Sequence, residues 1–222
     1  MANKNFSVTY QTLSPFGPRI GVIKLSDYII NKMLKITDDI LSDNNRINYG
    51  ENLAGQIKEE PYISNELLKK ENLYGFFCHL QKMYVQSVLG SDKLNGKPLK
   101  TGITSMWGIS QYENEYNPVH WHEGATLSSV FYLKIPKYEP RNIPGKHNRD
   151  GQIVFMNNPS TPQVSLENPM YEFSPEVGDM FIWPSRLMHC VYPFKGRGER
   201  RSVAFNGFHL FEEEEQNKQL IL

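Results

Sequence analysis

The pattern of apolar and polar positions changes character near residue 100. Before that point, apolar residues recur at steps of three and four, which is typical of helices with one buried face. A second such run, from Leu73 to Leu89, is rich in aromatic residues and stops before Gly90, a residue type that often ends a helix. The first run follows Ser26, a residue type that caps helix N-termini, and its apolar positions are Ile29, Ile30, Met33, Ile36, Ile40 and Leu41. We therefore predict two helices in the first half of the chain.

After residue 100 the apolar segments are short, aromatic and β-branched, and they are bounded by Pro, Gly and Asn, which is typical of strands. No helix of ordinary length fits between them, so we expect antiparallel strands in a jelly roll or barrel. The predicted strands are Ile103–Tyr112, Leu127–Ile135, Gln152–Phe155, Gly178–Trp183, His189–Tyr192 and Arg201–His209.

The organisation along the chain predicts a single domain over residues 1–222, mainly β with N-terminal helices. Residues 1–100 form a helical support region, residues 101–210 the β core, and residues 211–222 an acidic tail. Two long Pro- and Asn-rich loops, Lys137–Asp150 and Asn157–Glu176, interrupt the core. Loops of that length are usually functional.

Composition removes several classes of protein. Lys plus Arg number 24 and Asp plus Glu number 24, so no net positive charge favours nucleic acid or anionic lipid. The two cysteines, Cys78 and Cys190, are too few for a disulfide-stapled secreted scaffold. The first ten residues hold no apolar leader, and no apolar run reaches the roughly 20 residues that span a bilayer. We expect a cytoplasmic location.

Two histidines at the end of an extended segment are the first candidates for chemistry. His120 and His122 are two residues apart, and such positions on a strand point to the same face. Glu123 and Gly124 follow as a turn, which would leave the strand end open to a ligand. A surface turn with histidines by chance is the alternative for this motif alone.

His189 strengthens the case for a metal centre. It follows a strand that ends in a Pro184-Ser185 turn, and it opens the next strand. Two imidazoles and one further ligand would leave open coordination positions, which suits non-haem Fe(II). A closed zinc site would be expected to use more cysteine than this chain has.

Arg200 and Ser202 are candidates for holding an anionic ligand. They share one face of a strand, and we expect the turn at residues 195–199 to be a hairpin that places this strand beside His189. A guanidinium there could bind a carboxylate through two hydrogen bonds, with the hydroxyl adding another. The alternative is a solvated basic hairpin over Lys195–Arg201.

Three motifs in order resemble those of the 2-oxoglutarate- and Fe(II)-dependent oxygenases. They are N-x-x-H-x-H-x-G-x-x-L-S-x-x-x-Y-L (Asn117 to Leu133), G-D-x-x-x-x-P-S-x-x-x-H-x-V-x-P (Gly178 to Pro193) and R-x-S-x-x-F-N (Arg200 to Asn206). The chain is most similar to a group of uncharacterised oxygenases with the H-x-H variant. The resemblance covers residues 103–209 and implies a double-stranded β-helix, Fe(II), 2-oxoglutarate and O₂. It further implies oxidative decarboxylation of 2-oxoglutarate coupled to oxidation, as in a hydroxylase, of an unknown substrate.

The resemblance assigns roles position by position. His120 and His189 would bind the metal, and Arg200 with Ser202 would bind the far carboxylate of 2-oxoglutarate. The third ligand departs from the usual pattern, because His122 stands where most of these enzymes have Asp or Glu. Strand parity favours His122 as the ligand, charge favours Glu123, and water could complete the shell instead. We expect His122.

Two other classes of protein remain as alternatives. A cupin-type metalloprotein shares the barrel and the His-x-His pair, but Thr126 and Leu127 stand where a cupin would carry its Glu. A non-catalytic jelly-roll binding module would keep the fold without any dependence on iron. The sequence carries no motif for the primary substrate beyond the small-molecule co-substrate.

Overall fold

The computed structural model describes residues 9–13, 17–94, 98–139, 144, 147–157 and 169–211. The N-terminal part holds α1 (Asp27–Ser42), the 3₁₀ turn η1 (Gly50–Asn52), α2 (Asn65–Lys70) and α3 (Tyr74–Leu94). The strands are β1 (Thr9–Leu13), β2 (Ile20–Lys24), β3 (Leu99–Gln111), β4 (Asn117–His120), β5 (Leu127–Lys134), β6 (Ile153–Met156), β7 (Met170–Phe173), β8 (Asp179–Pro184), β9 (Met188–Val191) and β10 (Arg200–Phe211).

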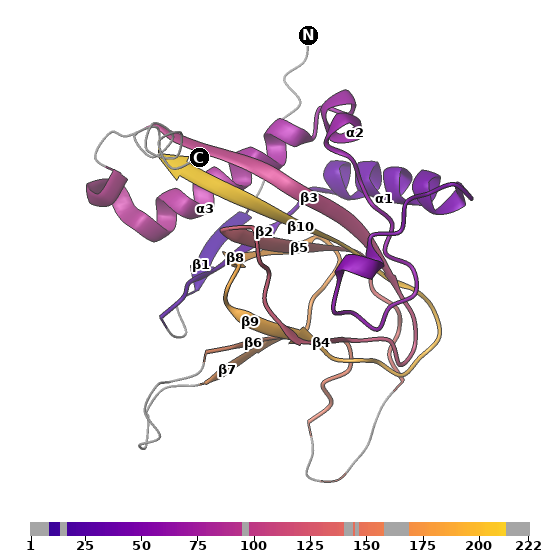
Figure 1. The fold of residues 1–222 in the computed structure, drawn as a ribbon. Helices are drawn as coiled ribbons and strands as arrows, with labels where there is room; N and C mark the ends of the chain where they lie inside the picture. The colour runs from indigo at the N-terminus through magenta and orange to yellow at the C-terminus, as the bar shows by residue number, and fades with distance from the viewer. Residues whose placement is uncertain are drawn as a thin grey trace.

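The strands form two sheets. Six strands make the larger sheet in the order β1-β2-β8-β5-β10-β3, and four make the smaller one in the order β4-β9-β6-β7. Every paired strand runs antiparallel to its neighbour. The larger sheet lies above the smaller one in Figure 1, with the helices on its far side. This arrangement is the jelly-roll, or double-stranded β-helix, architecture that the sequence predicts.

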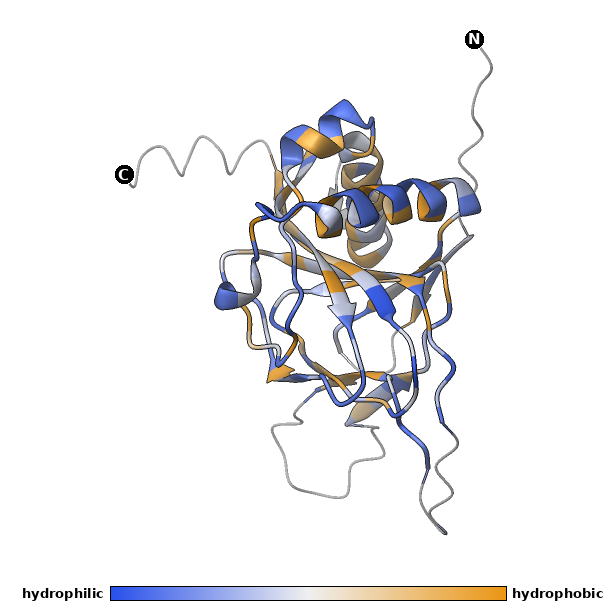
Figure 2. Ribbon diagram, turned by 90° about the vertical axis from the view of Figure 1, so that its right-hand side faces the viewer, coloured by the Kyte–Doolittle hydropathy of each residue, from blue (hydrophilic) through white to orange (hydrophobic). Residues whose placement is uncertain are grey.

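The larger sheet is buried on both faces, because its side chains alternate between two cores. On β10, Val203 and Phe205 join the core under the helices, whereas Ala204 joins the core between the sheets. On β5, Phe131 and Tyr132 divide in the same way. Apolar and polar residues alternate around the helices that cover this sheet (Figure 2). The larger sheet, which is packed on both faces, therefore forms one wall of the space between the two sheets.

Both predicted helices are confirmed. Ser26 is the N-cap of α1, where its carbonyl accepts from the amides of Ile29 and Ile30. The backbone leaves helical geometry at Gly90, whose φ of +74° suits a glycine at a helix end. The six predicted strands are also present, shifted by a few residues at their ends.

The expected hairpin at residues 195–199 is wrong. β9 belongs to the smaller sheet, between β4 and β6, whereas β10 belongs to the larger sheet, between β5 and β3. The segment after β9 therefore crosses from one sheet to the other, and Arg200 faces the histidines across the interior instead of lying beside them. A turn motif fixes local chain reversal but not the sheet in which the next strand pairs.

Much of the two predicted functional loops lies outside the described residues, namely 140–143, 145–146 and 158–168, and so does nearly all of the acidic tail. Within the part that is described, no helix is both long and apolar enough to cross a membrane.

Candidate metal centre and binding pocket

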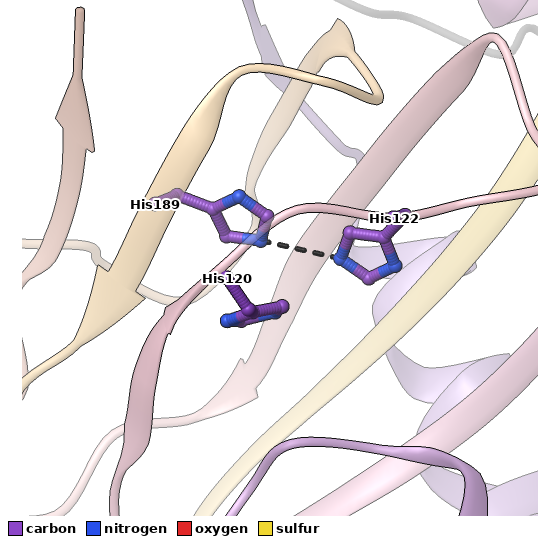
Figure 3. Close-up of side chains that lie close together, drawn as sticks. All are labelled: His120, His122 and His189. Atoms are coloured by element: carbon purple, nitrogen blue, oxygen red, sulfur yellow. Dashed lines mark hydrogen bonds between the residues drawn. The ribbon is translucent and has the colours of Figure 1, made fainter. Parts of the chain in front are cut away.

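Three histidines converge between the two sheets. The ligand atoms of His120, His122 and His189 all lie within 4.8 Å of one another. His120 pairs with His189 across β4 and β9, and their ring centroids are 4.2 Å apart. The Nε2 atoms of His122 and His189 are 3.2 Å apart, and a dashed line joins these two rings in Figure 3. Two nitrogens that each lie about 2.1 Å from one metal are separated by about 3 Å when the angle is near 90°.

Backbone carbonyls orient two of the three rings. The Nδ1–H of His120 donates to the Pro118 carbonyl at 2.7 Å, and that of His189 donates to the Leu187 carbonyl at 3.0 Å. Because Nδ1 carries the proton in both rings, Nε2 presents its lone pair toward the centre of the cluster. This is the state in which imidazole binds a metal.

The surroundings keep the imidazoles neutral. Burial, followed by its neighbour His120, lowers the pKa of His122 to about 4. Burial and the other two rings hold the pKa of His189 well below its usual value, and burial lowers that of His120. The three side chains can therefore accept a cation at neutral pH without first losing protons.

The Pro184-Ser185 turn fixes the segment that carries His122. The carbonyl of Ser185 accepts from the His122 amide at 2.9 Å, and its hydroxyl donates to the Ala125 carbonyl at 2.6 Å. The Ser185 amide donates to Thr126. These contacts place His122 inward although β4 has already ended at His120. Glu123, the other candidate for the third ligand, is exposed and does not join the cluster.

A pocket extends from the histidines to Arg200 on the opposite sheet. Arg200, Ser202 and Ala204 all line it, as alternation along β10 requires. Arg200 is 2% exposed; its NH1 donates to Gln111 Oε1 at 2.6 Å, and its guanidinium lies 4.8 Å from the ring centre of Tyr132. A buried guanidinium without a carboxylate partner is costly, so this one is well placed for an anionic ligand.

Four hydrogen-bond donors of the pocket wall have no partner among the residues that the structure describes. All four are buried and belong to residues that line the pocket. These donors are Ser129 Oγ, Tyr132 Oη, Trp183 Nε1 and Arg200 Nε. All four can donate a hydrogen bond, and buried donors are normally satisfied. The donor set therefore fits an anion rich in oxygen atoms, such as a keto-diacid.

Sequence reasoning missed two of the residues that complete this pocket, Gln111 and Glu60, and left Tyr132 undecided between pocket lining and core. Gln111 orients Arg200 because the two are cross-strand partners of β3 and β10, and that register cannot be read from the sequence. Tyr132 lies within one of the quoted motifs, but an aromatic side chain on a strand is equally compatible with plain core packing. Glu60, which also lines the pocket, comes from the segment before α2, where no motif marks it.

Glu60 gives a prediction about stability. Its side chain is 1% exposed, and burial, with Glu115 nearby, raises its pKa to about 7. The unfolded chain releases this proton near pH 4.5, so the ionised carboxyl costs the folded state stability as pH rises from 5 to 8. Relative to Glu60→Gln, the wild-type protein should lose on the order of 1–3 kcal/mol of unfolding free energy over that range. Urea denaturation at pH 5 and pH 8 measures it, and a difference between the two proteins that is independent of pH would contradict it.

Comparisons with known proteins find one matching family and several similar folds. Residues 105–206 match the family described as "Putative 2OG-Fe(II) oxygenase". Among solved structures, a prolyl hydroxylase from Trichoplax adhaerens, in complex with a hypoxia inducible factor peptide, is similar at 13% identity and a TM-score of 0.54, over 89% of this chain and 86% of that one. The α-ketoglutarate dependent epimerase SnoN from nogalamycin biosynthesis is similar at 12% identity and a TM-score of 0.50, over 85% and 75%. No protein of curated function matches in sequence.

The jelly-roll fold and the family match thus point to the same class of protein. Residues 105–206, just under half of the chain, match the 2-oxoglutarate- and Fe(II)-dependent oxygenase family, and the match spans the three histidines and Arg200. The name of that family gives iron and 2-oxoglutarate as its cofactor and co-substrate. The cupin and the non-catalytic module, the two alternatives from the sequence, are set aside.

Proposed function

We propose that His120, His122 and His189 hold the Fe(II), that Arg200 and Ser202 bind the far carboxylate of 2-oxoglutarate, and that the enzyme hydroxylates its substrate. When bound, Fe(II) and 2-oxoglutarate would together supply the electrons that activate O₂ for oxidation of the substrate. The observation that carries the proposal is the mutual proximity of three imidazoles in a pocket whose far wall presents a buried, carboxylate-free guanidinium.

The chain's own residues bind and orient the co-substrate. Arg200 is held by Gln111 and by the ring of Tyr132, so its fork is preorganised before a carboxylate arrives. The hydroxyl of Tyr132 supplies a further donor beside it. Apolar side chains such as Ile109, Val130 and Ile153 line the same pocket and exclude water from the carboxylate. This exclusion strengthens the ionic hydrogen bonds.

The binding of 2-oxoglutarate tests the proposal. Under anaerobic conditions, calorimetric titration into the Fe(II)-loaded protein should show one equivalent of 2-oxoglutarate per chain. Glutarate, which has both carboxylates but no keto oxygen to chelate the metal, should bind at least about tenfold more weakly. Equal affinity for the two diacids, or no binding, would overturn the assignment.

A pair of neighbouring variants tests the third ligand. His122→Ala should lower the affinity for Fe(II) about tenfold or more, because one of three nitrogen donors is lost. Glu123→Ala should leave the affinity unchanged, because that carboxylate is exposed and stands apart from the cluster. Competition against a metal-binding dye measures both, and a larger effect at Glu123 would exchange the two roles.

Amino-acid composition argues against a nucleic-acid partner and for a reducing compartment. Equal numbers of acidic and basic residues give no argument for a nucleic-acid substrate. A reducing compartment such as the cytoplasm would suit the two unpaired cysteines, Cys78 and Cys190, and would keep iron in the Fe(II) state.

A further inference from the structure

Glu60 is the charged pocket residue that the proposed chemistry does not use. It lines the pocket together with Arg200, and it is 1% exposed. Its Oε2 has no hydrogen-bond partner within the described part of the chain. Among the residues that the structure describes, no ion pair joins Glu60 to Arg200 or to another cation. A buried carboxylate in this state is costly, so it marks a place where a ligand would restore the balance of charge.

Hydrogen bonds fix the backbone of Glu60 and so limit where its carboxyl can lie. Its carbonyl accepts from the Tyr49 amide at 2.7 Å, and its amide donates to Asn48 Oδ1 at 3.3 Å. The neighbouring residue Glu59 forms a β-bridge with Ser110 of β3. The segment is therefore tied to the barrel while the carboxyl stays unpaired.

Two glycines keep side chains away from this carboxyl. A Cβ added to Gly50 would lie 3.2 Å from Glu60 Oε2, and one added to Gly55 would lie 3.4 Å from Oε1. The added Cβ at Gly55 would also meet Asn117 Oδ1, another pocket residue, at 2.3 Å. A side chain at Gly50 would therefore press on the Glu60 carboxyl, and one at Gly55 would displace Asn117 beside it.

Donors and acceptors are segregated within the pocket. The unpartnered donors belong to Ser129, Tyr132, Trp183 and Arg200, which all lie on strands of the larger sheet. The unpartnered carboxylate belongs to the segment between η1 and α2, which contributes Leu53 and Ala54 to the lining as well. One wall therefore suits an anion, which is the co-substrate in the proposed function, and the other suits a cation.

We infer that Glu60 is a specificity-determining residue and that the primary substrate carries a basic nitrogen, an amine or guanidinium, which binds this carboxylate. The inference rests on the proposed function, because it takes the donor wall to be occupied by 2-oxoglutarate. Asn117, beside Gly55, offers an amide to the same group of the substrate. Burial raises the pKa of Glu60 to about 7, so a bound cation would also stabilise its ionised form.

A matched set of three probes tests the inference without knowledge of the substrate. The full chain is loaded anaerobically with Fe(II) and 2-oxoglutarate, and ligand-observed NMR at pH 8 measures the affinity of n-butylammonium, n-butanol and butyrate. The wild-type protein should bind butylammonium about tenfold or more tightly than butanol, and butyrate most weakly. In Glu60→Gln the amine and the alcohol should bind within about twofold of each other. Glu60→Lys should reverse the order in favour of butyrate.

Glu59→Gln is the control for the removal of one negative charge. Glu59 is paired with Arg46 and does not line the pocket, so this variant should keep the preference for the amine. The inference is overturned if the wild-type protein binds the three probes equally, if it binds none of them, or if the preference survives in Glu60→Gln. Failure of the proposed function is seen separately, because 2-oxoglutarate would then not bind in the loading step.

Discussion

Replacing His189 with alanine is expected to lower the affinity for Fe(II) by at least about a hundredfold. His189 is 4% exposed, and its Nδ1–H is held by the Leu187 carbonyl, so its Nε2 is firmly oriented toward the cluster. The two remaining rings, His120 and His122, come from one short segment. Without His189, β9 would provide no ligand to the metal. Calorimetry on the anaerobic protein measures the loss.

The control for His189 is another histidine of the chain. His79 is exposed on α3, and His79→Ala should leave iron affinity unchanged. Circular dichroism should show both variants folded, because the sheet register around β9 depends on backbone pairing with β4 and β6. Iron bound at full stoichiometry and unchanged affinity by folded His189→Ala would remove His189 from the ligand set.

Arg200→Ala is expected to weaken 2-oxoglutarate binding by about a hundredfold, and Arg200→Lys by about tenfold. The alanine variant loses both the charge and the hydrogen bonds of the guanidinium, whereas lysine keeps the charge without the planar fork. Metal affinity should stay the same in both, because Arg200 lies on the opposite sheet from β4 and β9. Calorimetry with the Fe(II)-loaded variants separates the two effects.

Arg197→Ala is the matched control for Arg200. Arg197 is exposed on the segment that enters β10, so its removal should not change co-substrate affinity. Arg201 is a poor control, because it is buried in ion pairs with Asp38 and Glu199 on the helical side. If Arg200→Ala bound 2-oxoglutarate as tightly as the wild-type protein, the pocket would need another anchor for the far carboxylate.

The sequence predicted well what depends on local periodicity. The apolar steps after Ser26 and before Gly90 correspond to α1 and α3, and alternation along β10 places Arg200 and Ser202 together on the pocket side. Strand parity also favoured an inward His122, but in the structure β4 ends at His120 and contacts with Ser185 turn His122 inward. The helices and the shared face of Arg200 and Ser202 follow from helix and strand geometry alone. Predicting them does not require knowing which strands pair.

What the sequence did not reveal depends on long-range pairing. β10 crosses to the sheet opposite β9, and Gln111 meets Arg200 only through the register of β3 with β10. β1 and β2 become strands because they extend the edge of the larger sheet beside β8. Glu60 reaches the pocket through a segment tied to β3 by isolated bridges. No local pattern encodes such contacts.

The most direct test of the whole account is a crystal structure of the anaerobic complex with Fe(II) and 2-oxoglutarate, with iron located by its anomalous scattering. The account predicts one iron about 2.1 Å from the Nε2 atoms of His120, His122 and His189, with the far carboxylate of the keto-diacid on the guanidinium of Arg200. Iron held by Glu123 in place of His122, or a diacid bound away from Arg200, would contradict it.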